Sequence, residues 1–369
     1  MTGGGVNLLG LRSHNTALVL DLLRTAGAAG ISRLELAERT GLTPQAVSKI
    51  TARLRADGLA ADAGRRASTG GKPRTVLRLV PEAGHAVGVH LDRDELRAVL
   101  VDLDGTVVGE RNTPLDLGAG AEAVLTRVAG AVEELWDGAA VRGGGCLSLL
   151  GAGIALPGPL DHVRGVLHRV TGFPEWDGYP LRGALSQRLG VPVVVDKDTN
   201  AAALGLAVGG EDGSFAYLHL GTGLGAGLVI GGSVHRGSRT GAGEFGHQVL
   251  QLDGPPCGCG DRGCIEALCL DAVARGCTHE AARVLGAGAA NLVGLLDIDR
   301  VLLGGRIVEA APETFVRGVR EVLEARARRT GGTPVPVRIA SGAGHGGGRR
   351  VAEGAAQCVL APVFGRDDG

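Results

Sequence analysis

The chain has 369 residues, of which 44% are hydrophobic and 21% charged, values typical of soluble globular proteins with two or three domains. No apolar run approaches the ~20 residues that cross a bilayer, and Met1–Arg12 lacks the pattern of a signal peptide. Residues 1–80 hold twelve Lys and Arg against five acidic residues, although the whole chain has a net charge of -1. A small basic segment joined to a larger acidic one indicates an N-terminal module that binds a polyanion.

Three short helices are predicted within the first 56 residues. The first covers Asn15–Ala26, and the second begins at Ser32, whose spacing from Glu35 fits a capping box. Thr43 is expected to cap the third helix, which has Pro44 at its first position, where a missing N–H costs nothing. A helix, a short turn and a second helix indicate a helix-turn-helix.

The third helix has an apolar stripe and an opposite face of polar and basic side chains, which suit base edges and phosphates in a major groove. The residues of this segment expected to contact DNA are Thr43, Gln45, Ser48, Lys49 and Arg53. Two β segments follow, Leu59–Ala63 and Thr75–Val80, and a Gly-rich stretch between them resembles a wing. Its cations, expected along the phosphate backbone, are Arg65, Arg66, Lys72 and Arg74. The alternative is a winged helix that contacts only proteins, with these cations in solvent.

The remaining chain repeats one order of elements, β-β-β-α-β-α. The elements expected in the first copy are strands at Ala86–Leu91, Leu96–Asp102, Thr106–Arg111, Gly151–Leu156 and Val191–Val195, and helices at Gly120–Trp136 and Leu181–Leu189. The strands expected in the second copy are Phe215–Leu220, Ala226–Ile230, Ser233–Arg236 and Arg300–Leu303. Two such copies facing each other predict an α/β, two-lobed architecture of the actin/hexokinase type, which binds ligands between its lobes.

Six motifs recur in order along this body: Gly153–Pro159, Asp198–Ala203, Leu220–Gly227, Gly243–His247, Cys257–Glu266 and Leu303–Gly305. With these motifs the chain resembles, along nearly its whole length, the ROK family of repressors, open reading frames and sugar kinases. The resemblance implies a winged helix-turn-helix at 1–81, a first lobe at 82–196, and a second lobe with a metal loop at 197–345. Residues 346–369 are expected to form a helix that returns to the first lobe.

Three of the seven cysteines fall between positions 257 and 264, which favours a reduced cytoplasm and a metal site over disulfides. With His247, the thiolates of Cys257, Cys259 and Cys264 would suit tetrahedral Zn²⁺ in a closed structural site. The alternative is three free thiols on a loop. The resemblance implies that the zinc holds the loop that carries the sugar-binding residues.

The same resemblance places Glu244, His247 and Glu266 around a sugar and Asp198 at the position of the kinase general base. Lys197 replaces an Asn that usually precedes this Asp, and Gly172 replaces another Asn of the family pattern. We therefore expect an effector other than plain glucose, with an anionic group such as phosphate that Lys197 could bind.

The chain lacks the Asp-x-Gly-Gly-Thr loop with which ROK kinases approach ATP, because its first hairpin reads Val87–Glu95 with His90 at the aspartate position. The second phosphate loop, Gly221–Gly227, is retained. We therefore predict no catalytic residues, with Asp198 vestigial.

These features predict a cytoplasmic, sugar-responsive transcription regulator, a repressor of carbohydrate genes, that binds operator DNA as a homodimer or homotetramer. The alternatives are an ATP-dependent sugar kinase with a DNA-binding head, and a regulator controlled by a protein partner.

Overall fold

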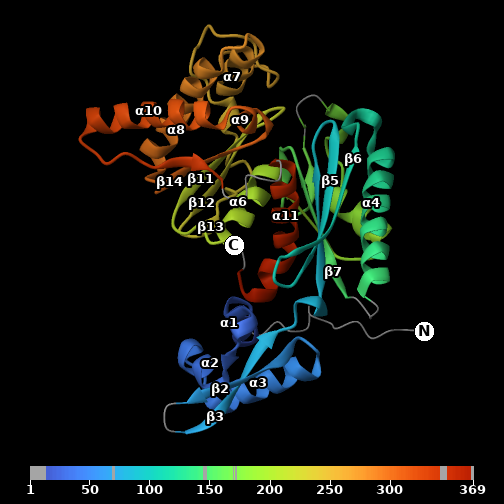
Figure 1. The fold of residues 1–369 in the computed structure, drawn as a ribbon. Helices are drawn as coiled ribbons and strands as arrows, with labels where there is room; N and C mark the ends of the chain where they lie inside the picture. The colour runs from blue at the N-terminus through green and yellow to red at the C-terminus, as the bar shows by residue number, and fades with distance from the viewer. Residues whose placement is uncertain are drawn as a thin grey trace.

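The computed structural model describes residues 14–68, 71–143, 148–168, 170, 173–340 and 347–366. Three parts are arranged around two central helices (Figure 1). A small N-terminal head lies below a body of two lobes, each built on a five-stranded sheet. In the described residues, none of the helices combines the length and apolar character needed to cross a membrane.

The head contains α1 (His14–Ala26), α2 (Arg33–Thr40) and α3 (Pro44–Ala56), followed by a three-stranded sheet of order β1-β3-β2. The predicted capping box is confirmed, because Ser32 accepts from Glu35 N and Glu35 accepts from Ser32 N at 2.8 Å. The Thr43 hydroxyl accepts from Ala46 N, which also confirms the third cap. The strands are β1 (Ile31–Ser32), β2 (Ala60–Ser68) and β3 (Gly71–Leu79).

The wing strands are longer than the sequence predicts, because the pairing of β2 with β3 continues past Thr75 to Ser68 and Gly71. Ladder hydrogen bonds therefore order most of the Gly-rich stretch that we expected to be a loop. The register of this pairing shifts between Asp62 and Gly64 and again between Arg66 and Ser68, as at β-bulges.

Lobe 1 is a mixed sheet of order β10-β7-β4-β5-β6. Its strands are β4 (His85–Leu91), β5 (Glu95–Asp102), β6 (Val107–Pro114), β7 (Leu149–Leu156) and β10 (Val193–Lys197), with a small hairpin of β8 (Leu160–Asp161) and β9 (Val166–Leu167). One face packs on α4 (Ala121–Gly143) and α5 (Leu181–Leu189) through a core that includes the buried Trp176. The other face is covered by α11 (Gly347–Leu360), as Figure 1 shows.

Lobe 2 repeats this design with a sheet of order β13-β12-β11-β14-β15. Its strands are β11 (Phe215–Leu220), β12 (Leu224–Ile230), β13 (Ser233–Val234), β14 (Arg300–Gly304) and β15 (Val337–Ile339). Four helices cover one face: α7 (Ile265–Ala274), α8 (Thr278–Leu296), α9 (Arg306–Ala310) and α10 (Pro312–Thr330). The opposite face packs on α6 (Asp198–Val208). The two-lobed α/β expectation is therefore confirmed.

The two central helices, α6 and α11, pack directly on each other and join the lobes. Their closeness requires glycine, since a Cβ at Gly354 would stand 1.9 Å from the Ala201 carbonyl oxygen. Likewise, a Cβ at Gly153 of β7 would stand 1.8 Å from the carbonyl oxygen of Ala355 in α11. The small residues of this layer thus set the distance between the lobes.

The head is attached to the body by a shared hydrophobic core. Leu20 and Leu23 of α1 belong to the same buried cluster as Leu360 and Phe364, where α11 continues into the 3-10 turn η7 (Ala361–Phe364). The guanidinium of Arg24 lies 4.5 Å from the centre of the Phe364 ring. α1 thus packs on η7, which continues α11, so the head contacts the end of this central helix (Figure 1).

Candidate functional site

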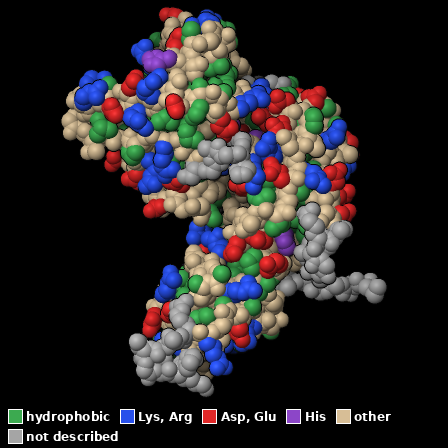
Figure 2. Space-filling model, in the orientation of Figure 1, with side chains coloured by type: hydrophobic (Ala, Val, Ile, Leu, Met, Phe, Trp, Pro, Cys, Tyr) green, Lys and Arg blue, Asp and Glu red, His purple; other side chains and the backbone are tan. Residues whose placement is uncertain are grey.

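The polar face of α3 is fully available to a partner. The five residues of this segment expected to contact DNA are all exposed: Thr43, Gln45, Ser48, Lys49 and Arg53. Val47 and Leu54 on the opposite face are completely buried, so the helix is fixed with this polar face outward. Of the wing cations, Arg65 and Arg74 are exposed, whereas the side chains of Arg66 and Lys72 lie outside the described residues. Figure 2 shows Lys and Arg side chains spread over the visible face of the head.

All five residues expected at the sugar site line one cleft between the lobes, with a volume of about 90 Å³. They are Lys197, Asp198, Glu244, His247 and Glu266. Asp198 is the first residue of α6, and its carboxylate accepts from Thr199 N at 2.6 Å. Glu266 lies in the first turn of α7 and accepts from Leu224 N at 2.7 Å, so it also holds the Gly-rich loop at 221–227.

Lys197 is engaged within the protein. Its ammonium donates to Glu244 Oε1 at 2.9 Å and to the carbonyl oxygen of Ala242, and its side chain is only 3% exposed. The positive charge of this lysine is therefore already balanced by Glu244. Gly172, the other departure from the family pattern, lies outside the described residues.

The cleft lining also includes residues that were not named as sugar-site candidates from the sequence, among them Asp92, Arg93, His219 and Thr222. Asp92, just after β4, accepts from the Thr222 hydroxyl at 3.0 Å and so joins lobe 1 to the Gly-rich loop of lobe 2. Burial alone would raise the pKa of Asp92, but nearby His90 and hydrogen bonds from Arg93 N–H and Thr222 lower it below its ordinary value. Asp92 is therefore held as a carboxylate at the junction of the two lobes.

A second link between the lobes lies directly behind the cleft. Asp196, at 1% exposed, pairs with Arg236 Nε at 2.9 Å, while its other oxygen accepts from Lys197 N and from the Asn200 amide. The spacing of 40 residues between Asp196 and Arg236 leaves no local signal in the sequence. The nearest signal in the sequence is the motif Asp198–Ala203, which begins two residues after Asp196.

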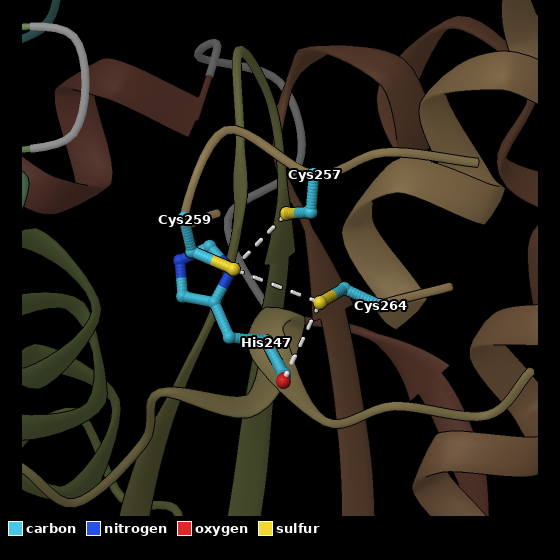
Figure 3. A group of neighbouring side chains, drawn as sticks. All are labelled: His247, Cys257, Cys259 and Cys264. Carbon is cyan, nitrogen blue, oxygen red and sulfur yellow. Dashed lines mark hydrogen bonds between the residues drawn. The ribbon is translucent and has the colours of Figure 1, made fainter. Parts of the chain in front are cut away.

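The four predicted metal ligands come together, as Figure 3 shows, with their side chains directed at a common point. Their ligand atoms all lie within 4.8 Å of one another. Cys259 Sγ is 3.7 Å from Cys264 Sγ, and Cys257 Sγ is 3.6 Å from His247 Nδ1. A tetrahedral Zn²⁺ with bonds of about 2.3 Å to sulfur and about 2.0 Å to nitrogen would separate its ligands by roughly 3.5–3.8 Å. The donor set and its spacing therefore fit a metal ion.

The protonation of this cluster also bears on metal binding. Burial and hydrogen bonds with the neighbouring thiols raise the pKa of Cys264 to about 12, and burial raises the pKa of Cys257. A metal ion held here would bind these groups as thiolates. Cys257 approaches Nδ1 of His247, whose ring also lines the cleft, so the cluster and the cleft share one side chain.

An exposed recognition helix with a wing, joined to a two-lobed body with a polar cleft, defines a DNA-binding regulator built on a ligand-binding domain. The chain belongs to the ROK family. The model described as "ROK family" matches residues 86–272, and the model "Winged helix-turn-helix DNA-binding" matches residues 19–60.

Among its relatives is the xylose repressor of Caldicellulosiruptor bescii, 27% identical over 80% of this chain and 84% of that protein. The transcriptional dual regulator NagC of Escherichia coli K12 is 30% identical over 74% of this chain and 67% of that protein. A ROK family transcriptional regulator, a homologue of the E. coli MLC protein, shares the fold with a TM-score of 0.72 at 21% identity, over 95% and 99% of the two chains. The ROK hexokinase of Thermus thermophilus aligns at 30% identity with a TM-score of 0.58, over 74% of this chain and 96% of that one.

Proposed function

We propose that this protein is a sugar-responsive repressor that binds operator DNA through α3 and the wing. The observation that supports this most directly is the convergence of Asp198, Glu244, His247 and Glu266 on one cleft in a chain whose recognition helix is exposed. Carboxylates and an imidazole are the groups that bind vicinal hydroxyls in sugar sites. The names of the repressor relatives support the same function.

The effector we propose is a sugar, and the pairing of Lys197 with Glu244 favours a neutral sugar over a sugar phosphate in this cleft. Sugar binding would close the cleft and move α6 against α11, and α11 would move α1 and the recognition helix of the head. Such coupling requires that the sugar bind one arrangement of the lobes more tightly than the other. We propose a homodimer or homotetramer in the cytoplasm. In such an assembly, this motion would change the distance between two recognition helices bound to the operator.

A thermal-shift screen of neutral sugars and sugar phosphates tests the cleft, because stabilisation rises with occupancy of the native state. We expect at least one sugar to raise the Tm of the wild type and not that of Glu266→Gln. Operator fragments selected from random DNA by the full-length protein would then be titrated with and without that sugar. No thermal shift with any sugar, together with recovery of a protein partner in a pull-down, would favour control by that partner instead.

We further propose that the His247, Cys257, Cys259 and Cys264 cluster holds structural Zn²⁺. Four protein ligands leave no open position for a reacting water, so the ion would stabilise the loop between η6 (Phe245–His247) and α7 and fix the ring of His247. We expect about one zinc per chain by elemental analysis of the purified protein and a loss of metal in Cys264→Ser. A matched variant, Cys277→Ser, should retain the zinc, and zinc-free wild-type protein of unchanged Tm would contradict the proposal.

The protein is proposed to lack kinase activity. The reason is that the Asp-x-Gly-Gly-Thr loop of ROK kinases is missing from the first hairpin, where His90 stands at the aspartate position, so that one of the two phosphate loops is retained without the other. The alternative, an ATP-dependent sugar kinase, is supported by the retained loop 221–227 and by Asp198 in the cleft. A coupled assay for ADP release over a sugar panel decides between them, since turnover that disappears in Asp198→Asn would establish the kinase.

A further inference from the structure

His219 lines the sugar cleft, although the proposed sugar site does not use it. Side chains of a strand alternate between its two faces, so Phe215, Tyr217 and His219 of β11 share one face. Phe215 and Tyr217 pack on this face in one buried cluster with residues of the central helices α6 and α11 (Figure 1). His219 lies near the end of the strand and is partly exposed, so it reaches the cleft that the two buried residues do not line.

The two ring nitrogens of His219 have different surroundings. Nδ1 is 3.0 Å from the hydroxyl oxygen of Tyr217, a residue that is completely buried. Nε2 has no hydrogen-bond partner among the described residues, yet it is not one of their buried unsatisfied atoms, so it is open to solvent. A Cβ at Gly221 would stand 3.0 Å from Nε2, and the missing side chain therefore keeps this nitrogen uncovered. The ring thus presents Nε2 to the cleft.

The contact with Tyr217 determines which ring nitrogen carries the proton. Burial raises the pKa of Tyr217, so its hydroxyl keeps its proton at neutral pH. The guanidinium of Arg350 in α11 acts on this hydroxyl through its charge and as a hydrogen-bond donor, and a guanidinium cannot accept. The Tyr217 oxygen therefore accepts from Arg350, and its own proton is left to donate to Nδ1 of His219. A neutral His219 then carries its proton on Nε2.

We propose that His219 is a further sugar-binding residue, whose Nε2–H donates to a hydroxyl oxygen of a neutral sugar, and that Tyr217 is the positioning residue that sets this tautomer. Asp198, Glu244 and Glu266 offer the cleft carboxylate oxygens, which only accept. A sugar hydroxyl both donates and accepts, so a donor beside these acceptors completes its recognition. The inference rests on the proposed sugar response and adds a residue to it.

The tautomer is tested on the full-length protein without any ligand. ¹⁵N NMR of histidine-labelled protein at about pH 8, above the ordinary histidine pKa, distinguishes a ring nitrogen that carries a proton from one that accepts. The signals of His219 are those lost in His219→Gln. We expect a protonated Nε2 and an accepting Nδ1 in the wild type, and a mixture of the two tautomers in Tyr217→Phe. A wild-type His219 protonated at Nδ1, alone or together with Nε2, would overturn the proposal.

The contact with the sugar is tested by titration calorimetry with three neutral probes: D-glucose, D-xylose and N-acetyl-D-glucosamine. Gln carries an amide N–H that can replace Nε2–H, whereas Leu carries no donor. Because loss of one neutral hydrogen bond weakens binding about three- to tenfold, we expect a loss of this size in His219→Leu and recovery of most of the affinity in His219→Gln. The control is His279→Leu, which alters an exposed histidine of α8 and should bind sugar as the wild type does.

The outcomes separate this proposal from the sugar response on which it rests. A sugar that binds His219→Leu as tightly as the wild type, or a loss in His219→Gln as large as that in His219→Leu, would overturn the role of His219. If Tyr217→Phe fails to fold, the wild-type tautomer and the two His219 variants decide. Binding of none of the three sugars to the wild type is a different result, because it contradicts the sugar response itself, and the contact of His219 with it, whatever the tautomer.

Discussion

Removal of Arg236 from the buried pair behind the cleft should destabilise the protein strongly. In Arg236→Met, Asp196 would keep the hydrogen bonds from Lys197 N and Asn200 but lose the guanidinium 2.9 Å from its second oxygen. Asp196 is 1% exposed, and His162 Nδ1, which lies 3.9 Å from the same oxygen, is already within 2.9 Å of the Val195 carbonyl oxygen, so we expect the lost guanidinium to stay unreplaced. Breaking one side of a buried pair costs about 3–5 kcal/mol, which corresponds to a fall in Tm of about 6–20 °C for a unit of roughly 150–250 residues.

The assay is thermal unfolding followed by calorimetry, in a double-mutant cycle with Asp196→Asn. We expect the double variant to be more stable than the sum of the single effects predicts, because neither charge is then left alone. Arg275→Met provides the matched control, since Arg275 also pairs with a carboxylate at 3.0 Å but is half exposed, and its Tm should stay close to that of the wild type. Equal shifts for Arg236→Met and Arg275→Met, or strictly additive effects in the cycle, would refute the reasoning.

Two further predictions concern the head and the cleft. Lys49→Ala should weaken binding to all DNA sequences and reduce the slope of log Kd against log salt by about 0.9, measured by fluorescence anisotropy, because one phosphate contact is lost; an unchanged slope would place Lys49 away from the backbone. Burial lowers the pKa of His90 from its ordinary value of 6.5, in spite of the opposing effects of Asp198 and Asp92. The unfolded chain therefore binds a proton that the folded chain does not, and the free energy of unfolding should fall as the pH drops below 6.5. His90→Gln should flatten this fall in urea titrations, and an equally steep fall in the variant would show that other groups cause it.

Much of the local structure could be predicted because it depends on residues close in the sequence. Ser32 and Thr43 each accept a hydrogen bond from the N–H group three residues later, at the start of α2 and α3. Both helices therefore begin where the sequence predicts. The strand Phe215–Leu220 and the helix Leu181–Leu189 were predicted with the bounds they have. The wing strands were underestimated because Gly, Lys and Pro have low strand propensity, and cross-strand pairing overrides it.

The candidate sites also combine features that depend on neighbouring residues with features that depend on tertiary contacts. The sequence by itself pointed to the candidate metal ligands, because three cysteines and a histidine fall within 18 residues, with glycines between the cysteines. It also determined the polar face of α3. Only the tertiary structure decided the bonds that join the lobes, such as Asp92 to Thr222, 130 residues apart. It alone revealed that Glu244 neutralises Lys197, and that Arg350 lies close to Tyr217. Such contacts arise when distant elements pack, and packing leaves no periodic or local signal in the chain.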